Sequence, residues 1–538
     1  MIEEVDYIIV GAGSAGCVLA NRLSADKTKQ VLLLEAGTGD RHPFIQMPGG
    51  YARLHRSTFD WGFQTEPQAQ VDDRQLYLPR GKVLGGSSST NAMAYVRGNR
   101  FDYDDWSDAG CVGWSYEDVL PYFLKSEHNE QFVELHGSYH QQGGPLHVSF
   151  SRRYCTPLAS AFIKACQAIG LPRNDDYNGK HQRGAGFFQF TIKQGVRQST
   201  ATAFLKPVLN RSNLHVLKQA HTTQILLAKN RATGVEVQHK KRTLRFRARQ
   251  EVILCAGAYQ SPQLLMLSGI GPQEELSRHR IELRHELPGV GQNLQDHLFY
   301  PVTGRTRGKD GLNHHLPAFA QILATGQWLF KKEGPVTIGP LEAVAFLNVK
   351  DGSGRVDAQF HFAPIFPGPD YKYDLYDQTS FPSHQDGYCI LPSLLRPRSR
   401  GYVALSSSNP YAPPLIQPNF LRETADLELL IAAGKEALTV MEHPALADRT
   451  LERVYPKHTA SDDDWAAHIR KSVETIYHPV GTCKMGQDEM AVVDHELKVH
   501  GVEGLRVVDG SVMPTIVSGN TNAPIIMIAE KAADFIVN

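Results

Sequence analysis

Three glycines near the start of the chain have the spacing of a loop that binds the phosphates of a dinucleotide. In Gly11-Ala-Gly-Ser-Ala-Gly16, Gly11 permits a tight turn, Gly13 lets a pyrophosphate approach the backbone, and Gly16 lets a helix and a strand pack closely. Glu35 follows at the distance at which an acid accepts a hydrogen bond from an adenosine ribose. This spacing predicts a dinucleotide site, open to both FAD and NAD. A glycine-rich turn without a ligand is the alternative.

The elements around these glycines are those that such a site needs. Residues 6–10 and 31–34 are short apolar runs that predict buried strands, and the apolar residues between them have helical spacing. The phosphates would lie at the N-terminus of this helix, where free N–H groups and the helix dipole favour anions.

The sequence contains no second copy of this unit. Gly269-Ile-Gly271 and Gly289-Val-Gly291 lack the third glycine and follow no clear strand. A flavin reductase fed by a nicotinamide usually has one dinucleotide unit for each cofactor. We therefore expect the electrons to come from an organic substrate.

The composition is that of an ordinary globular protein. At 538 residues the chain exceeds the size of a single core, so we expect at least two domains. The 56 basic and 56 acidic residues balance, which argues against nucleic acid as a partner. The seven cysteines are dispersed without a CxxC pair, which favours free thiols in a reducing compartment. With no signal peptide and no apolar run of transmembrane length, we expect a cytoplasmic protein.

Other strand–turn–helix units lie far along the chain. Residues 251–255 predict a strand that leads to a helix at 263–267, and the chain ends in a helix predicted from about 522 to 536. These units predict one sheet assembled from distant segments. Residues 311–475 are richer in aromatics, prolines and alternating runs such as 402–405, which predicts a separate antiparallel sheet with flanking helices.

A series of motifs along the chain resembles the signatures of glucose–methanol–choline (GMC) oxidoreductases. They are the glycine loop with Glu35, Arg80-Gly-Lys-Val-Leu-Gly-Gly-Ser-Ser-Ser-Thr-Asn91, the run from Gly257 to Gly271, Gly291-Gln-Asn-Leu-Gln-Asp-His297, Tyr477-His-Pro-Val-Gly-Thr482 and Val508-Asp-Gly-Ser-Val-Met-Pro514. The composition of residues 80–91 alone fits a flexible exposed loop as well as it fits a ligand-binding stretch. The motifs in this order span nearly the whole chain, so chance agreement is not a sufficient explanation.

The resemblance implies a mixed α/β fold with two domains. One is a Rossmann-like FAD-binding domain, to which we assign residues 1–140, 195–310 and 476–538. The other is a substrate-binding domain on an antiparallel sheet with flanking helices, to which we assign 141–194 and 311–475. The resemblance also implies oxidation of an alcohol to a carbonyl, with transfer of a hydride to the flavin.

Two residues match catalytic positions of the family. His478 matches the catalytic histidine, although a histidine outside such a motif is more often structural. Imidazole titrates near working pH, so it can remove the alcohol proton as the hydride leaves. Asn522 matches the second position, where an amide would hold the substrate oxygen. Its alternative or additional role is the N-cap of the last helix, whose dipole would stabilise reduced flavin.

The resemblance also implies contacts to FAD. Ser14, Ala15, Glu35 and Ala36 would hold the pyrophosphate and adenosine; Gly86, Ser87, Asn91 and Ala92 would face the flavin or ribityl chain; Thr222 would meet the adenine through its backbone; and Asp509 and Gly510 would meet the ribityl–phosphate region. Asp296 and His297 lie in a family motif, but we leave them out of the site. Some relatives attach FAD covalently through a histidine at the position of Thr90, so we expect noncovalent FAD here.

We therefore predict an FAD-dependent alcohol dehydrogenase that converts a primary, aliphatic alcohol into an aldehyde. The electrons would pass to an external acceptor other than NAD. The candidates for this acceptor are a quinone, a redox protein and oxygen. An oxygen-reducing alcohol oxidase and a choline dehydrogenase are alternatives, and a hydroxynitrile lyase-like flavoprotein is more remote. Glu342 is a candidate for recognising a cationic head group such as that of choline. A surface or structural carboxylate is the alternative. The oligomeric state is left open.

Two further segments have weaker signals. Residues 316–330 predict an amphipathic helix that we place against the core, with contact to the surface of the inner membrane as the alternative. His136 and His140 have the spacing of metal ligands, but the glycines around them indicate a loop, so we predict no metal site.

Overall fold

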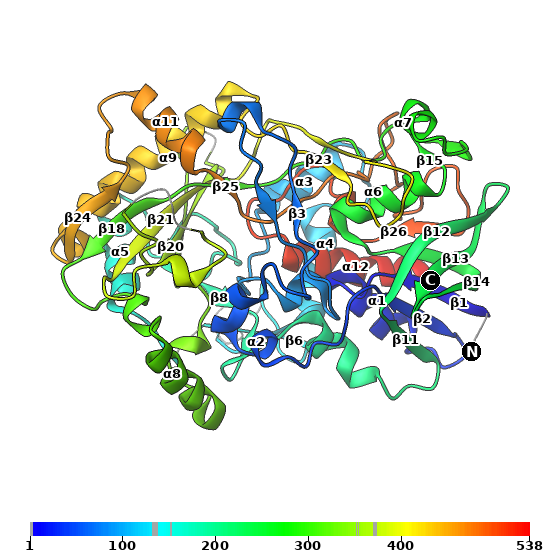
Figure 1. The fold of residues 1–538 in the computed structure, drawn as a ribbon, viewed down its shortest axis with the longest axis horizontal. Helices are drawn as coiled ribbons and strands as arrows, with labels where there is room; N and C mark the ends of the chain where they lie inside the picture. Colours follow the sequence, from blue (N-terminus) through cyan, green and yellow to red (C-terminus); the bar gives the residue numbers. More distant parts are fainter. Residues whose placement is uncertain are drawn as a thin grey trace.

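The structure is a computed structural model that describes residues 4–131, 138–150, 153–350, 352, 354–369 and 374–537. Two large sheets lie towards opposite ends of the long axis of the molecule, with short strands, helices and loops between them (Figure 1). This arrangement confirms the predicted mixed α/β fold with a Rossmann-like sheet and an antiparallel sheet.

The first sheet is parallel at its centre. Its central strands, in spatial order, are β11 (Leu214–Lys218), β2 (Val31–Glu35), β1 (Glu4–Val10), β14 (Arg242–Leu254) and β26 (Leu505–Val507). The strands β12 (Ala220–Ala228) and β13 (Arg231–His239) extend it as an antiparallel hairpin against the first half of β14. The sheet therefore draws on distant segments, as the strand–turn–helix units predict.

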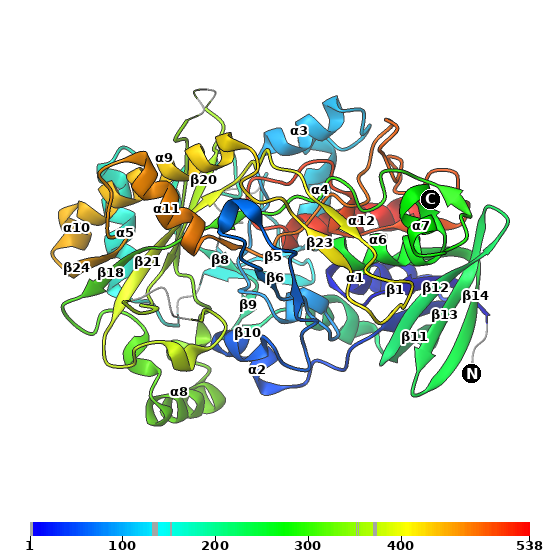
Figure 2. The same cartoon turned by 45° about the horizontal axis from the view of Figure 1, so that its top comes forward.

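Helices from both ends of the chain pack together on this sheet. They are α1 (Ser14–Leu23) and α12 (Asn522–Val537), which lie side by side in Figures 1 and 2. Arg22 on α1 pairs with the buried Glu530 on α12 at an Nη2–Oε1 distance of 2.6 Å. Gly16 allows α1 to approach β1, because a Cβ at this position would lie 1.9 Å from the carbonyl oxygen of Gly11.

The helix predicted at 263–267 begins earlier, as α6 (Gly257–Leu267). It contains Pro262, which lacks the N–H that would bond to the carbonyl oxygen of Ala258. The hydroxyl of Thr482 donates to that oxygen at 2.6 Å instead. A residue of a distant motif thus compensates for the proline, which local sequence does not reveal.

The second sheet is antiparallel. Its main strands, in spatial order, are β24 (Thr450–Tyr455), β18 (Val302–Thr306), β21 (Gly387–Leu394), β20 (Ala358–Ala363), β19 (Ala343–Leu347) and β7 (Gly184–Phe187). Helices α5 (Pro157–Ala168), α9 (Thr424–Glu442) and α11 (Asp462–Ser472) bury their apolar faces in the same core as these strands.

Two strand pairings differ from what the local sequence pattern indicates. The strands β17 (Leu298–Phe299) and β18 pair with β21, although we assigned residues 195–310 to the FAD-binding domain. The run 402–405 forms β22 (Tyr402–Ala404), which pairs with β23 (Leu415–Gln417) in a separate ribbon. Strand partners are set by tertiary contacts that an alternating pattern does not encode. Our domain limits otherwise stay a prediction.

The placement of the helix predicted at 316–330 is wrong. It is α8 (Ala318–Lys331), and it projects from the lower edge of the molecule in Figures 1 and 2. Of its side chains, Ala324 and Trp328 are buried, whereas Phe319 and Phe330 are 72% and 89% exposed. Helical spacing shows that a stripe is apolar, but does not show what covers it. Among the described residues, no helix is long and apolar enough to cross a membrane.

Candidate active site

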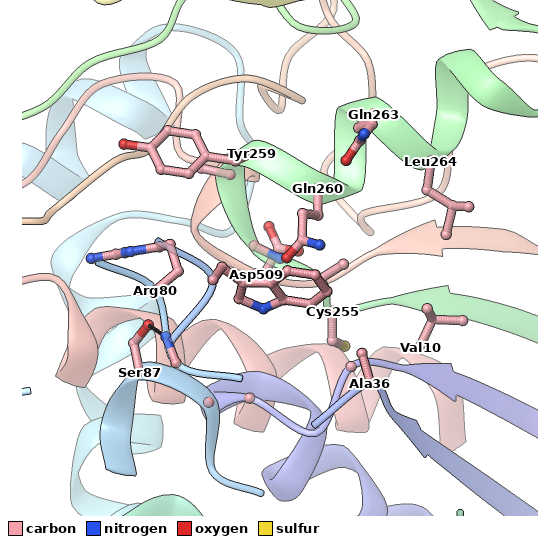
Figure 3. A pocket seen from close by; sticks show the side chains of 18 of the residues that line it. Val10, Ala36, Arg80, Ser87, Cys255, Tyr259, Gln260, Gln263, Leu264 and Asp509 are labelled. Carbon is pink, nitrogen blue, oxygen red and sulfur yellow. Dashed lines mark hydrogen bonds between the residues drawn. The ribbon is translucent and has the colours of Figure 1, made fainter. Parts of the chain in front are cut away.

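A cavity of about 170 Å³, here called the first cavity, lies at the carboxyl ends of β1 and β2, between the N-terminus of α1 and α6. Figure 3 shows Ser87 and Ala36 on one side of it and Tyr259 and Gln260 on the other. Ligands of open parallel sheets bind in this position. Many predicted cofactor residues line it: Gly11, Gly13, Ser14, Ala15, Glu35, Ala36, Gly86, Ser87, Thr222, Asp509 and Gly510. Gly16 is absent from its lining and instead packs α1 on β1, as above.

Glu35 joins the glycine loop to the end of β2. Its buried carboxylate accepts the N–H groups of Ala12 at 3.0 Å and Gly37 at 2.7 Å. Burial raises the pKa of Glu35 to about 7, and the two N–H donors oppose that shift. The acid predicted to meet the ribose is therefore held rigidly by the loop it accompanies.

The loop after Arg80 lies directly on the glycine loop. The N–H of Gly85 donates to the carbonyl oxygen of Ala12 at 2.7 Å. Gly86 has a φ of +52°, and a Cβ on it would lie 2.7 Å from the Cα of Gly13. Glycine suits both this left-handed conformation and this contact. Because residues 86–89 form a short, mostly buried 3₁₀ helix, the alternative of a flexible exposed loop does not hold.

The lining of the first cavity suits the diphosphate of a dinucleotide such as FAD. A Cβ at Gly257 would meet no described atom within 4 Å, and one at Gly13 only the carbonyl oxygen of Cys255 at 3.8 Å, so the backbone faces open space. The first turn of α1 presents free N–H groups there. Asp509 is fixed beside this space by the N–H of Gly257 at 2.8 Å and the hydroxyl of Ser261 at 2.6 Å.

A second cavity of about 260 Å³ continues from the first, because Ser14, Arg80, Ser87 and Ile525 line both. The predicted residues Asn91, Ala92, His478 and Asn522 line this second cavity. Much of its remaining wall is apolar or aromatic: Tyr51, Met93, Phe299, Pro301, Pro340, Leu341, Ala363, Ile365, Leu375, Tyr376, Phe381, Leu391, Ile476 and Tyr477. The structure thus brings the predicted catalytic and flavin residues together at one wall of an apolar chamber.

His478 is paired with a second histidine. Its Nδ1 lies 3.0 Å from Nδ1 of His297, whose Nε2 lies 2.9 Å from the carbonyl oxygen of Leu395. A carbonyl oxygen only accepts, so we assign the proton of His297 to Nε2 and its lone pair to Nδ1. His478 then donates from Nδ1, which leaves its Nε2 unprotonated.

The backbone around His478 is held from both sides. The N–H of His478 donates to Asp296 at 2.7 Å, and the carbonyl oxygen of Tyr477 accepts from Arg80 at 2.6 Å. Tyr477 has a φ of +68°, a strained conformation for a bulky residue. These bonds fix the position of the imidazole. Asp296 and His297, which the sequence reading left out, therefore belong to the site; their place beside each other in a family motif is the signal that identifies them.

The amide beside His478 is Asn520, which corrects the prediction of Asn522. Asn520 Nδ2 lies 3.2 Å from His478 Nε2, and Asn520 lines the second cavity. Asn522 Oδ1 instead accepts the hydroxyl of Ser14 at 2.7 Å and so links the first residues of α1 and α12. Asn522 is the first residue of α12, and the turn before it carries Asn520 towards His478.

Burial keeps the histidines of this wall neutral. It lowers the pKa of His478 well below its usual value, and the positive charge of Arg80, like any proton gained by His297 or His361, lowers it further. It lowers the pKa of His297 to about 4 and of His361 to about 3. His361 also lines the second cavity; its Nδ1 lies 3.1 Å from the hydroxyl of Ser393, and its Nε2 has no partner among the described residues.

Two other candidate residues have structural surroundings. Glu342 lines neither cavity; its buried carboxylate accepts the N–H of Thr156 at 3.0 Å and also the hydroxyl of Thr156. His140 Nε2 contacts Asp176 at 2.9 Å. His136 lies outside the described residues, within which no group of three or more potential ligands could hold a metal ion.

Comparison with known proteins gives one family for the chain. The models of the GMC oxidoreductases match residues 5–299 and 397–529. The chain is 43% identical to the "alcohol dehydrogenase [acceptor]" of Pseudomonas putida, covering 99% of this chain and 95% of that protein. It is 41% identical to the "oxygen-dependent choline dehydrogenase" of Photobacterium profundum, covering 100% of this chain and 94% of that protein.

Solved structures of two oxidases have a similar fold. Pyridoxine 4-oxidase from Mesorbium loti superposes with a TM-score of 0.88 at 31% identity, covering 98% of both chains. Formate oxidase from Aspergillus oryzae RIB40 superposes with a TM-score of 0.92 at 29% identity, covering 99% of this chain and 98% of that one.

Proposed function

Because the chain belongs to the GMC oxidoreductase family, for which FAD is the expected cofactor, we propose that it oxidises a primary aliphatic alcohol to the aldehyde. The observation that carries the proposal is the unprotonated Nε2 of His478 beside Asn520 in an apolar cavity next to a dinucleotide cavity. FAD, when bound, supplies the acceptor for the hydride of the alcohol carbon.

His478 is the base of this reaction. Its Nε2 takes the hydroxyl proton, and its Nδ1–H stays bonded to His297 while the imidazole becomes charged. Asn520 Nδ2, which donates to this nitrogen in the structure, would donate to the substrate oxygen instead and hold it there without taking the proton. Asp296 and Arg80 keep the segment in place during the transfer.

The residues of the first cavity would hold FAD. Glu35 would accept from the ribose, the N-terminus of α1 would bind the diphosphate, and Thr222 would lie beside the adenine. Gly86, Ser87, Asn91 and Ala92 would face the flavin and its chain, because they lie at or near the junction of the two cavities. Thr90 lines the second cavity and has no nucleophilic nitrogen, which supports noncovalent FAD.

The lining of the second cavity favours an uncharged, apolar alcohol over choline. Its lining residues include no Asp or Glu within the described part of the chain, and Arg80 adds a positive charge. The aromatic side chains of the lining could bind a quaternary ammonium through cation–π contacts, but no lining carboxylate would neutralise its charge and Arg80 would repel it. An alkyl chain would bury apolar surface against Leu341, Phe381 and their neighbours.

The electrons would then leave to an external acceptor that is not a nicotinamide. This follows from the presence of one glycine-loop unit in the sequence, which the proposed FAD occupies. A quinone, a redox protein and oxygen are the acceptor classes. Turnover with a quinone-like dye, compared with turnover in oxygenated buffer, distinguishes a dehydrogenase from an oxidase.

The test is anaerobic bleaching of the flavin by a panel of linear, aromatic and amino alcohols. Linear primary alcohols should bleach it fastest and choline much more slowly. The variant His478→Ala should retain FAD and lose about 10²–10⁴-fold of the reduction rate. His215→Ala, in β11, is the control and should reduce normally. Persistent yellow colour with every alcohol would reject the proposal and favour a non-redox flavoprotein.

A further inference from the structure

Helix α8 has its most apolar face turned outwards. Phe319, Ile322, Leu323, Leu329 and Phe330 are 72%, 68%, 58%, 55% and 89% exposed. At 100° per residue they fall on one continuous side of the helix, together with Gly326. Other large exposed apolar residues, such as Val112, Leu283 and Leu451, lie singly on separate segments. The face is therefore a concentrated patch, of a kind that marks a contact surface.

The opposite side of α8 is fixed to the protein. Trp328 Nε1 donates to the carbonyl oxygen of Gly195 at 2.7 Å, and the ammonium of Lys332 lies 3.7 Å from the centre of the indole ring. Gln321 bonds to Arg53 and donates to the carbonyl oxygen of Leu316 at 2.7 Å. The helix thus presents its apolar face in a defined orientation.

Basic residues lie on the side of α8 opposite the apolar face and at the C-terminal end of the helix. Arg53 is exposed beside the middle of the helix, and Lys331 and Lys332 stand at its end. The exposed Arg153 donates to the carbonyl oxygen of Lys332 at 3.2 Å. Residues 318–331 include no acid, and Glu333 is the nearest one along the chain. A helix with one exposed apolar face and basic residues on its other side and end has the pattern of interfacial helices, whose apolar face meets lipid acyl chains and whose cations meet anionic headgroups.

The geometry points to a bilayer surface, and we propose that α8 is the helix through which this protein lies on an anionic membrane. A helix of 14 residues is about 21 Å long, so its outer face is small beside the roughly 800 Å² per partner of a standard protein interface. An interfacial helix needs only to sink its outer side chains about 5–10 Å into the headgroup boundary. A helix that projects from the edge of the molecule, as α8 does in Figures 1 and 2, suits that contact.

This contact would bring the membrane close to the second cavity. From α8 the chain passes through a 3₁₀ turn at Pro335–Thr337 to Pro340 and Leu341, which line that cavity. The proposal does not depend on which alcohol is oxidised, and its test measures binding rather than turnover.

The test is flotation of the full-length, flavin-loaded protein with vesicles. Wild type should float with vesicles of equal phosphatidylglycerol and phosphatidylcholine and bind pure phosphatidylcholine about tenfold or more weakly. Phe319→Ser/Phe330→Ser should weaken binding to the anionic vesicles about tenfold or more. Val112→Ser/Leu283→Ser removes comparable exposed apolar groups elsewhere and should bind as wild type does.

A second pair of substitutions tests the contribution of the basic residues separately. Lys331→Gln/Lys332→Gln should weaken binding to anionic vesicles about tenfold and leave the weak binding to neutral vesicles unchanged. Flavin content and sedimentation velocity check folding and association in every variant. Absence of wild-type flotation would overturn the proposal. So would equal flotation of the Phe319/Phe330 variant, or a dimer that this variant abolishes, since the face would then bind a second copy.

Discussion

His297 and His478 face each other through their Nδ1 atoms at 3.0 Å, inside a wall where both imidazoles are neutral. The bond from His297 to the Leu395 carbonyl makes His297 an acceptor and fixes the lone pair of His478 on Nε2. A carboxylate in the place of His297 would fix the same tautomer, but would also raise the pKa of His478. A neutral imidazole fixes the tautomer and leaves the pKa of the base low.

Removal of His297 should therefore impair the base without removing it. In His297→Ala, the Nδ1–H of His478 loses its acceptor, so both tautomers become populated. We expect flavin reduction to slow about 10–100-fold, with FAD content unchanged. His297→Gln restores an acceptor oxygen and should recover part of the rate in stopped-flow reduction. If His297→Ala and His297→Gln were equally slow, the effect would be structural and the positioning role would be refuted.

The low pKa of His478 predicts the pH dependence of the reductive step. Burial disfavours the charged imidazole, so His478 is already unprotonated at neutral pH. The rate constant for flavin reduction should be flat from about pH 6.5 to 8 and should fall only at lower pH, as His478 gains a proton. Stopped-flow reduction across this range checks it. A decrease in this rate constant centred at or above pH 7 would contradict the assignment of His478 as a base with a low pKa.

Much of the fold was predictable because its signals are local. The strand, glycine loop and acid from residues 6 to 35 identify the Rossmann-like unit, and the alternating runs of the middle region indicate an antiparallel sheet. The pairing of β17 and β18 with β21 and the outward face of α8 were not predictable, since both depend on what packs opposite. The compensation of Pro262 by Thr482 is likewise a contact between distant segments.

A site residue could be predicted where it forms part of a recognisable family motif. His478 is such a case. Asn520 and Asn522 are both asparagines in one short turn, and the sequence does not show that the entry into α12 directs the first at His478 and the second at Ser14. His297 becomes significant only when β17 brings it against His478.

Substitution of the two asparagines should consequently impair the enzyme in different ways. Asn520→Ala removes the donor beside His478 Nε2 and should slow flavin reduction about 10–100-fold while FAD is retained. Asn522→Ala breaks the link between α1 and α12 and should weaken FAD retention more than it slows reduction. Reduction kinetics and the flavin-to-protein absorbance ratio separate the two outcomes. The opposite pattern would restore Asn522 as the catalytic amide.

A methyl group at Gly86 should separate the two loops of the first cavity. In Gly86→Ala the new Cβ would lie 2.7 Å from the Cα of Gly13, so one loop must move. We expect loss of most bound FAD and a lower melting temperature. Gly113→Ala is the matched control: Gly113 also has a positive φ, of +80°, but no atom of the described chain within 4 Å of a Cβ. It should cost about 1 kcal/mol of conformational strain and keep its flavin. Equal FAD loss in both variants would show that strain, rather than loop contact, is responsible.

Glu342→Gln should change stability in a pH-dependent way, because the Glu342 carboxyl is buried and, within the described part of the chain, its hydrogen bonds are with the uncharged Thr156. Burial raises its pKa to about 7 from an ordinary value of 4.5, so the folded state binds the extra proton between these values. The favourable contribution of the protonated carboxyl is complete below pH 4.5 and is lost as the pH rises through 7. A glutamine keeps the shape without charge: its Oε1 can accept the Thr156 N–H, and its Nε2 can donate to the Thr156 hydroxyl oxygen. The variant should therefore match wild type near pH 5 and exceed its free energy of unfolding by about 1–3 kcal/mol at pH 8. Denaturant unfolding at the two pH values measures this difference. A variant that is equally or less stable at pH 8, or that loses activity towards alcohols at pH 5, would instead indicate that the Glu342 charge has a role in the enzyme.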